Sequence, residues 1–156
     1  MRNERMLNQI YNAYDGVETT YEEMLTNAKN MVNYIFAAYG WHYTEEQKKK
    51  MFAMFCAWVA AADGAPNRKE HEFFVKISGL NVNYEGFRDT GLQMINNAKA
   101  CEEMKMLNKN VLKSGTNYDY AANIIALCLC GCDGPINRSE INFLDRYICH
   151  PDYNPF

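Results

Sequence analysis

The sequence predicts an all-α fold of about seven helices, packed as a compact bundle. Apolar residues recur at helical spacing, as they do between positions 87 and 104. Alternating runs of β-branched residues, which would indicate strands, are absent. The four prolines stand close to glycine or at the tail, so none interrupts a periodic segment.

Capping residues and glycines divide the N-terminal half into four expected helices. The first begins near position 3 and stops at Asp15-Gly16, and the second is opened by Thr19 or Thr20, each three residues before a Glu. The predicted helices of this half cover residues 3–14, 20–40, 44–62 and 67–79, with Thr44 and Asn67 as caps.

The C-terminal half continues in the same way. One long or two shorter helices are expected over residues 83–113, then a helix from Thr116 to Cys132 and a last one from Asn137 to about Cys149. The 156 residues form a single domain in this prediction, with an N-terminal helical extension (1–43), a first repeat (44–79), connecting helices (80–113) and a second repeat (114–150).

Composition excludes several classes of function. The net charge is −3 and no basic patch occurs, so the sequence does not support binding to nucleic acid or to anionic membranes. The lysine run 48–50 follows two glutamates at helical spacing and indicates a solvated helix face. The longest apolar run, 51–62, is too short to span a bilayer, and no secretion signal opens the chain. We therefore expect a cytoplasmic protein without membrane insertion.

An internal repeat is the most informative feature. Shifting the sequence by 70 residues aligns 63–74 with 133–144, and six of the twelve pairs are identical. Each copy follows a nearly apolar stretch, so each reads as a buried helix, an Asp-Gly turn and an amphipathic helix. One such hairpin cannot cover its own apolar face, and we expect the two to pack as a pseudo-symmetric pair.

Turn chemistry accounts for most of the repeated residues. Gly64 and Gly134 suit the end of a helix, while Asn67 and Asn137 are helix caps that Glu70 and Glu140 complete as capping boxes. In the second copy Ile136 and Ile141 add a hydrophobic staple, and in the first copy Pro66 and His71 occupy those places.

The repeated aspartates, Asp63 and Asp133, are not explained by capping, because the C-terminal end of a helix disfavours an acid. Two readings stay open. In the first, the aspartate makes an Asx-type turn or pairs with the repeated Arg68 or Arg138. In the second, a divalent cation is held by Asp63 with Glu70 in one copy and by Asp133 with Glu140 in the other. Carboxylate ligands favour Ca²⁺ or Mg²⁺ over Zn²⁺.

These residues resemble the TerB-like domain of tellurite-resistance and related bacterial stress proteins. The resemblance rests on Ala61-Ala62-Asp63-Gly64 with Glu70, and on Cys132-Asp133-Gly134 with Glu140, and covers roughly residues 44–150. It implies a compact all-helical fold with internal pseudo-symmetry, a proposed metal-binding role for the paired acids and no established catalytic activity. A weaker echo of the spacing occurs at Asp15 and Glu22.

No catalytic motif is found, so we expect a non-enzymatic protein that acts through protein partners. The alternative is a pure interaction module whose acids only cap helices. Aromatic residues crowd the N-terminal third and form a candidate surface for a partner or for a homodimer: Tyr11, Tyr14, Tyr21, Tyr34, Tyr39, Trp41 and Tyr43. The other reading is that they cover the repeat core.

Six cysteines could indicate disulfides or zinc. Five lie in apolar helical stretches, and Cys128, Cys130 and Cys132 are two apart, which on a helix points them to different faces. We expect the thiols to be reduced, with Cys56, Cys128 and Cys130 in the core.

Overall fold

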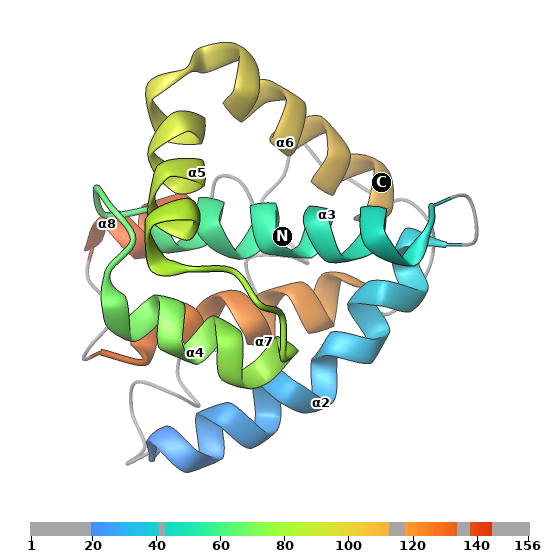
Figure 1. Cartoon of the computed structure of the whole chain (residues 1–156), viewed down its shortest axis with the longest axis vertical. Helices are drawn as coiled ribbons and strands as arrows, with labels where there is room; N and C mark the ends of the chain where they lie inside the picture. Colours follow the sequence, from blue (N-terminus) through green and yellow to red (C-terminus); the bar gives the residue numbers. More distant parts are fainter. Residues whose placement is uncertain (1–19, 41–42, 113–117, 134–137, 145–156) are drawn as a thin grey trace.

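The computed structural model describes residues 20–40, 43–112, 118–133 and 138–144. Within these ranges the chain forms seven helices and no strand, so the predicted all-α fold is confirmed (Figure 1). The helices are α2 (Tyr21–Tyr39), α3 (Glu45–Ala60), α4 (Arg68–Ser78), α5 (Tyr84–Asn96), α6 (Ala98–Leu112), α7 (Tyr118–Gly131) and α8 (Arg138–Phe143).

The helices begin and end largely where the caps predicted. The Thr20 hydroxyl accepts a hydrogen bond from the Glu23 N–H at the start of α2. Thr44 and Gln47 complete a capping box at the start of α3. Gly79 takes the left-handed conformation, with φ of +71°, that ends α4. The backbone of Asn97 is extended and separates α5 from α6. Of the two predicted possibilities for residues 83–113, the structure therefore has the two shorter helices.

Two helices form the centre of the molecule. In α7, every residue from Ala121 to Cys130 is buried, and α3 is buried almost continuously from Met51 to Ala60. The two helices contact each other, and both end on the same side of the bundle, at the left of Figure 1. This arrangement brings Asp63 and Asp133, which follow α3 and α7, to one side.

The other helices cover this central pair. Helix α2 packs along α7 and α4, and α5 packs on α3. The approach of α5 to α3 is close: a Cβ atom on Gly91 would lie 2.6 Å from Pro66 Cγ and 2.7 Å from the Ala57 carbonyl oxygen. Glycine at position 91 therefore sets the distance between these two helices.

The aromatic residues of the N-terminal third do not share one environment. Tyr39 is buried, and the Tyr21 ring lies edge-on to Phe73 with 5.9 Å between centroids. Tyr34 and Tyr43 are exposed. Tyr11, Tyr14 and Trp41 lie outside the described residues. Tyr21 and Tyr39 thus help to cover the core, while Tyr34 and Tyr43 remain candidates for the predicted partner surface.

The cysteines lie as predicted where the structure describes them. Cys56, Cys128 and Cys130 are fully buried, and all five described cysteines are free thiols. The sixth, Cys149, falls outside the described residues. A search of the described helices finds none with the length and apolar character needed to cross a bilayer.

Candidate metal centre

The first Asp-Gly turn carries Asp63 directly beyond the end of α3. Gly64 adopts a φ of +134°, which only glycine tolerates easily, and its N–H donates to the Ala61 carbonyl at 3.0 Å. The turn reverses the chain into α4. The Asp63 carboxylate, although exposed as a residue, points inward towards the other acids.

The Asn67 cap fixes Glu70 at the start of α4. The Glu70 N–H donates to Asn67 Oδ1, and the Asn67 N–H donates to Glu70 Oε1, each at 2.9 Å. The predicted capping box is therefore present. Its second member is 1% exposed, so the capping carboxyl group is also a buried acid.

Asn67 joins the two repeats as well. Its side-chain Nδ2 donates to Asp133 Oδ2 at 2.6 Å, which links the cap of the first copy to the aspartate of the second. The Asp133 carboxylate, beyond the end of α7, is thus held by an amide from the opposite hairpin. The sequence contained no signal for this bond, because it depends on how the hairpins face each other.

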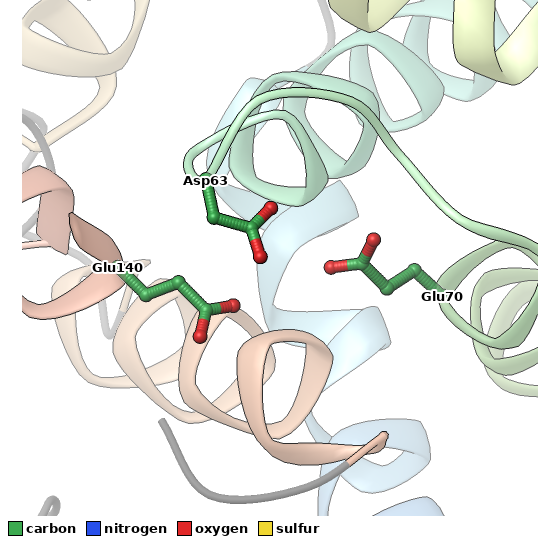
Figure 2. A group of neighbouring side chains, drawn as sticks. All are labelled: Asp63, Glu70 and Glu140. Atoms are coloured by element: carbon green, nitrogen blue, oxygen red, sulfur yellow. The ribbon is translucent and has the colours of Figure 1, made fainter. Parts of the chain in front are cut away.

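Glu140, in α8, is buried and completes a cluster of three acids. One carboxylate oxygen each from Asp63, Glu70 and Glu140 can be chosen so that all three atoms lie within 4.8 Å of one another. Figure 2 shows the three side chains converging from the α3–α4 turn, from α4 and from α8. We call this group the acidic cluster.

The acidic cluster differs from the expected arrangement of ligands. The sequence predicted one pair of acids in each copy. In the structure, two acids of the first copy, Asp63 and Glu70, lie together with Glu140 of the second. Asp133 stands beside this group as the partner of Asn67. Gly134 and Asn137 lie outside the described residues, as do Asp15 and Gly16 of the weaker echo; Glu22 is exposed on α2.

Burial and neighbouring charge act together on Glu70. Loss of solvent is the larger cause, and the carboxylates of Asp133, Asp63 and Glu140 add to it, so the pKa of Glu70 rises to about 9. The Asn67 N–H opposes this rise. At neutral pH and without a counter-charge, Glu70 is therefore protonated.

Two thiols of α7 adjoin the cluster. Burial raises the pKa of Cys130 well above its usual range, and the Glu140 carboxylate, within hydrogen-bonding reach of this thiol, raises it further. Burial and then Glu70 also raise the pKa of Cys132, whose Sγ donates to the Leu129 carbonyl at 3.2 Å. Both thiols are therefore protonated neighbours of the acids at neutral pH. The sequence predicted Cys130 as a core residue and did not predict that it would lie beside the acids.

The repeated arginine of the first copy has another role. The Arg68 guanidinium lies over the Tyr84 ring, 4.3 Å from its centroid, and Arg88 approaches the same ring at 5.6 Å. The Tyr84 hydroxyl donates to the Pro66 carbonyl at 3.1 Å. Helix α5 thus secures the turn that leads to Glu70.

His71 supports the same connection. Its Nε2–H donates to the Val82 carbonyl, and its ring packs on those of Tyr84 and Phe87. The first copy therefore has polar and aromatic contacts to α5 at this place. The staple predicted for the second copy involves Ile136 and the side chain of Ile141, which lie outside the described part of the structure.

The geometry of the acidic cluster fits a hard divalent cation. Two oxygens on opposite sides of Ca²⁺, each bonded at about 2.3–2.6 Å, stand about 4.6–5.2 Å apart. The cluster oxygens lie within 4.8 Å of one another, so they could bind Ca²⁺ without large movement and Mg²⁺ after a small contraction.

Comparisons of this chain with protein-family models, with curated proteins and with solved structures give no match. The TerB-like resemblance thus rests on the repeated residues alone.

Proposed function

We propose that this chain is a non-enzymatic, TerB-like helical domain that binds a divalent cation at Asp63, Glu70 and Glu140. In this proposal it acts through protein partners in a bacterial stress response of the tellurite-resistance kind. The observation that carries the cation-binding part is the meeting of three carboxyl groups, two of them buried, from both repeats.

Electrostatics support a cation at this position. Burying a carboxylate is costly unless it is paired or binds a metal, and here the nearest acids raise the cost further. A divalent cation would replace the proton of Glu70 and neutralise its neighbours, and binding would release that proton to solvent. Ca²⁺ or Mg²⁺ suits the oxygen ligands better than Zn²⁺, which favours nitrogen and sulfur.

The alternative is a pure interaction module in which the acids serve only as structural caps. The complete Asn67–Glu70 capping box and the bond from Asn67 to Asp133 favour it, because they account for two acids without a ligand. In that case protonation of Glu70 would be sufficient to relieve the repulsion in the cluster.

Thermal unfolding separates the two functions. A ligand that binds only the folded state at a hundredfold excess over Kd stabilises it by about 2.7 kcal/mol, which raises the melting temperature of a domain this size by several degrees. Calcium, magnesium, manganese and zinc should each be compared with chelator. The cation function predicts a rise with calcium or magnesium, and the interaction module predicts none.

Substitutions test which acids are responsible. Asp63→Asn, Glu70→Gln and Glu140→Gln keep the side-chain shape and each remove a ligand charge, so each should lose most of the cation-dependent rise. Asp133→Asn is the matched control, because it removes a nearby charge outside the acidic cluster, and it should keep most of the rise. An equal loss in all four variants would indicate a general charge effect and would refute the three-acid site.

The proposed partner role needs a separate measurement. Cross-linking in a stressed bacterial host, followed by purification of the tagged chain, should recover the same proteins repeatedly. Replacing the exposed Tyr34 and Tyr43 by serine tests the aromatic surface, and retention of every partner in that variant would place the binding surface elsewhere.

A further inference from the structure

A cleft lies between the first half of α3 and the connection from α4 to α5, which turns back beneath α3 in Figure 1. Helix α3 contributes Glu46, Lys49, Lys50 and Ala53, and residues 79–82 form the opposite wall. None of these residues belongs to the acidic cluster. The volume of the cleft is about 490 Å³. This lies within the range of about 300–1,000 Å³ that is usual for small-ligand sites.

The wall formed by residues 79–82 is held in place by hydrogen bonds and by the core. The Leu80 N–H donates to the Ser78 hydroxyl oxygen at 3.2 Å, and the Val82 carbonyl accepts from the His71 ring. The Leu80 and Val82 side chains also pack against the core. The wall is therefore formed before any ligand binds, which lowers the entropic cost of binding.

The two sides of the cleft combine an apolar base with charged groups at the edge. The four α3 residues are spaced as one face of a helix. Ala53 is half-buried and packs against the core, as Leu80 and Val82 do, whereas Lys49 and Lys50 are exposed. A molecule in the cleft would thus contact apolar surface at one end and ammonium groups at the other.

The lysines of the run 48–50 differ in their partners. Lys48 pairs with Glu45 at 3.3 Å, and Lys49 Nζ lies 3.5 Å from Glu46 Oε1. Within the part of the chain that the structure describes, Lys50 forms no ion pair. The predicted solvated face therefore leaves one positive charge at the edge of the cleft without a counter-charge.

We propose that this cleft binds a small anionic amphiphile, a molecule with a short hydrocarbon chain and a carboxylate or phosphate head. The chain lies on Ala53, Leu80 and Val82, where it is removed from water. The head pairs with Lys50 and competes with Glu46 for Lys49, since an ammonium group donates hydrogen bonds to either kind of head. This site is independent of the proposed cation site.

Binding of monomeric octanoate to the full chain tests the site. NMR spectra of the backbone amides locate the ligand, and calorimetry gives the affinity. Octanoate should shift the amides of residues 50–53 and 79–82 and leave those of α7 unchanged. Octyl phosphate should bind at the same place, and the tighter of the two identifies the preferred head. Acetate, which lacks the chain, and 1-octanol, which lacks the charge, should both bind much more weakly.

Three substitutions test the role of charge. Lys50→Gln should weaken octanoate binding about fivefold. Glu46→Gln should tighten it, because Lys49 is then free to pair with the ligand. Lys48→Gln is the matched control: it removes the same charge from an adjacent residue that does not line the cleft, and its affinity should equal that of wild type. Circular dichroism checks that each variant is folded.

Several results would overturn the proposal. Equal affinities for octanoate and 1-octanol, or equal losses in Lys48→Gln and Lys50→Gln, would refute a specific anion site. Amide shifts confined to other helices would refute the assignment to this cleft, and so would the absence of any shift at millimolar octanoate. The cation function is measured separately by thermal unfolding, so its failure and the failure of this site are distinguishable.

Discussion

Two opposing effects act on the charge of the Glu70 carboxyl group. Its Oε1 accepts the Asn67 N–H and completes a cap that stabilises α4, while burial and three neighbouring carboxylates disfavour its charge. A capping glutamate is usually solvated. Here the packing around Glu70 raises its pKa, so the acid holds a proton at neutral pH.

Glu70→Gln should stabilise the protein in chelator at neutral and alkaline pH. Below the ordinary pKa of 4.5, folded and unfolded chains both hold the proton. As the pH rises from there to about 9, the unfolded chain releases the proton and the folded chain keeps it, so the wild type loses stability across this window.

Glutamine keeps the acceptor for Asn67 without this penalty, and the gain should be about 3 kcal/mol at pH 7 and vanish near pH 4. Chemical denaturation at several pH values in EDTA measures it. Glu72→Gln, at an exposed position, is the control. A Glu70→Gln variant less stable than wild type at pH 8 would contradict the raised pKa.

The bond from Asn67 to Asp133 can be measured by a double-mutant cycle. Asn67→Ala loses the cap and this bond together, whereas Asp133→Ala loses the bond alone, so the coupling energy isolates the link between the repeats. Because the bond is exposed and charge-assisted, we expect a coupling of about 1 kcal/mol from urea denaturation. Additive single and double variants would mean that the link has no energetic role.

The separation of α3 and α5 depends on Gly91. Gly91→Ala would place a methyl group in contact with the Ala57 carbonyl oxygen and the Pro66 ring, so either the backbone or the turn before α4 must move. Alanine gains about 1 kcal/mol in helix propensity, but overpacking costs about 1–3 kcal/mol, and we expect a lower melting temperature. Gln93→Ala, exposed on the same helix, should have little effect.

Helix boundaries were predictable where a local hydrogen bond sets them. The Thr44–Gln47 and Asn67–Glu70 boxes lie where the residue types predicted. The division at Asn97 was left open, because the residues around it, 92–102, include neither glycine nor proline as a clear break. Helix α3 ends at Ala60, two residues earlier than expected, because the turn to Gly64 begins within the apolar run.

The core should behave as one cooperative unit towards thiol reagents. Cys56, Cys128 and Cys130 are fully buried on the two central helices, and burial raises the pKa of Cys56 and Cys130 well above the usual value. In native protein these three should react with a disulfide reagent only at the rate of global opening, and all should react quickly in denaturant. Rapid native labelling of Cys56 would show that α3 opens separately from the rest.

Within the described residues, the sequence by itself determined the helices, the α3–α4 hairpin and the buried central pair, because capping, glycine turns and apolar periodicity act between neighbouring residues. It also singled out Asp63, Glu70, Asp133 and Glu140 as the acids of interest. Only the tertiary structure decided that Asp63, Glu70 and Glu140 share one cluster and that Asp133 bonds to Asn67. The contacts between the two copies join residues about 70 positions apart, and their geometry depends on how α3 and α7 pack, which no local pattern specifies.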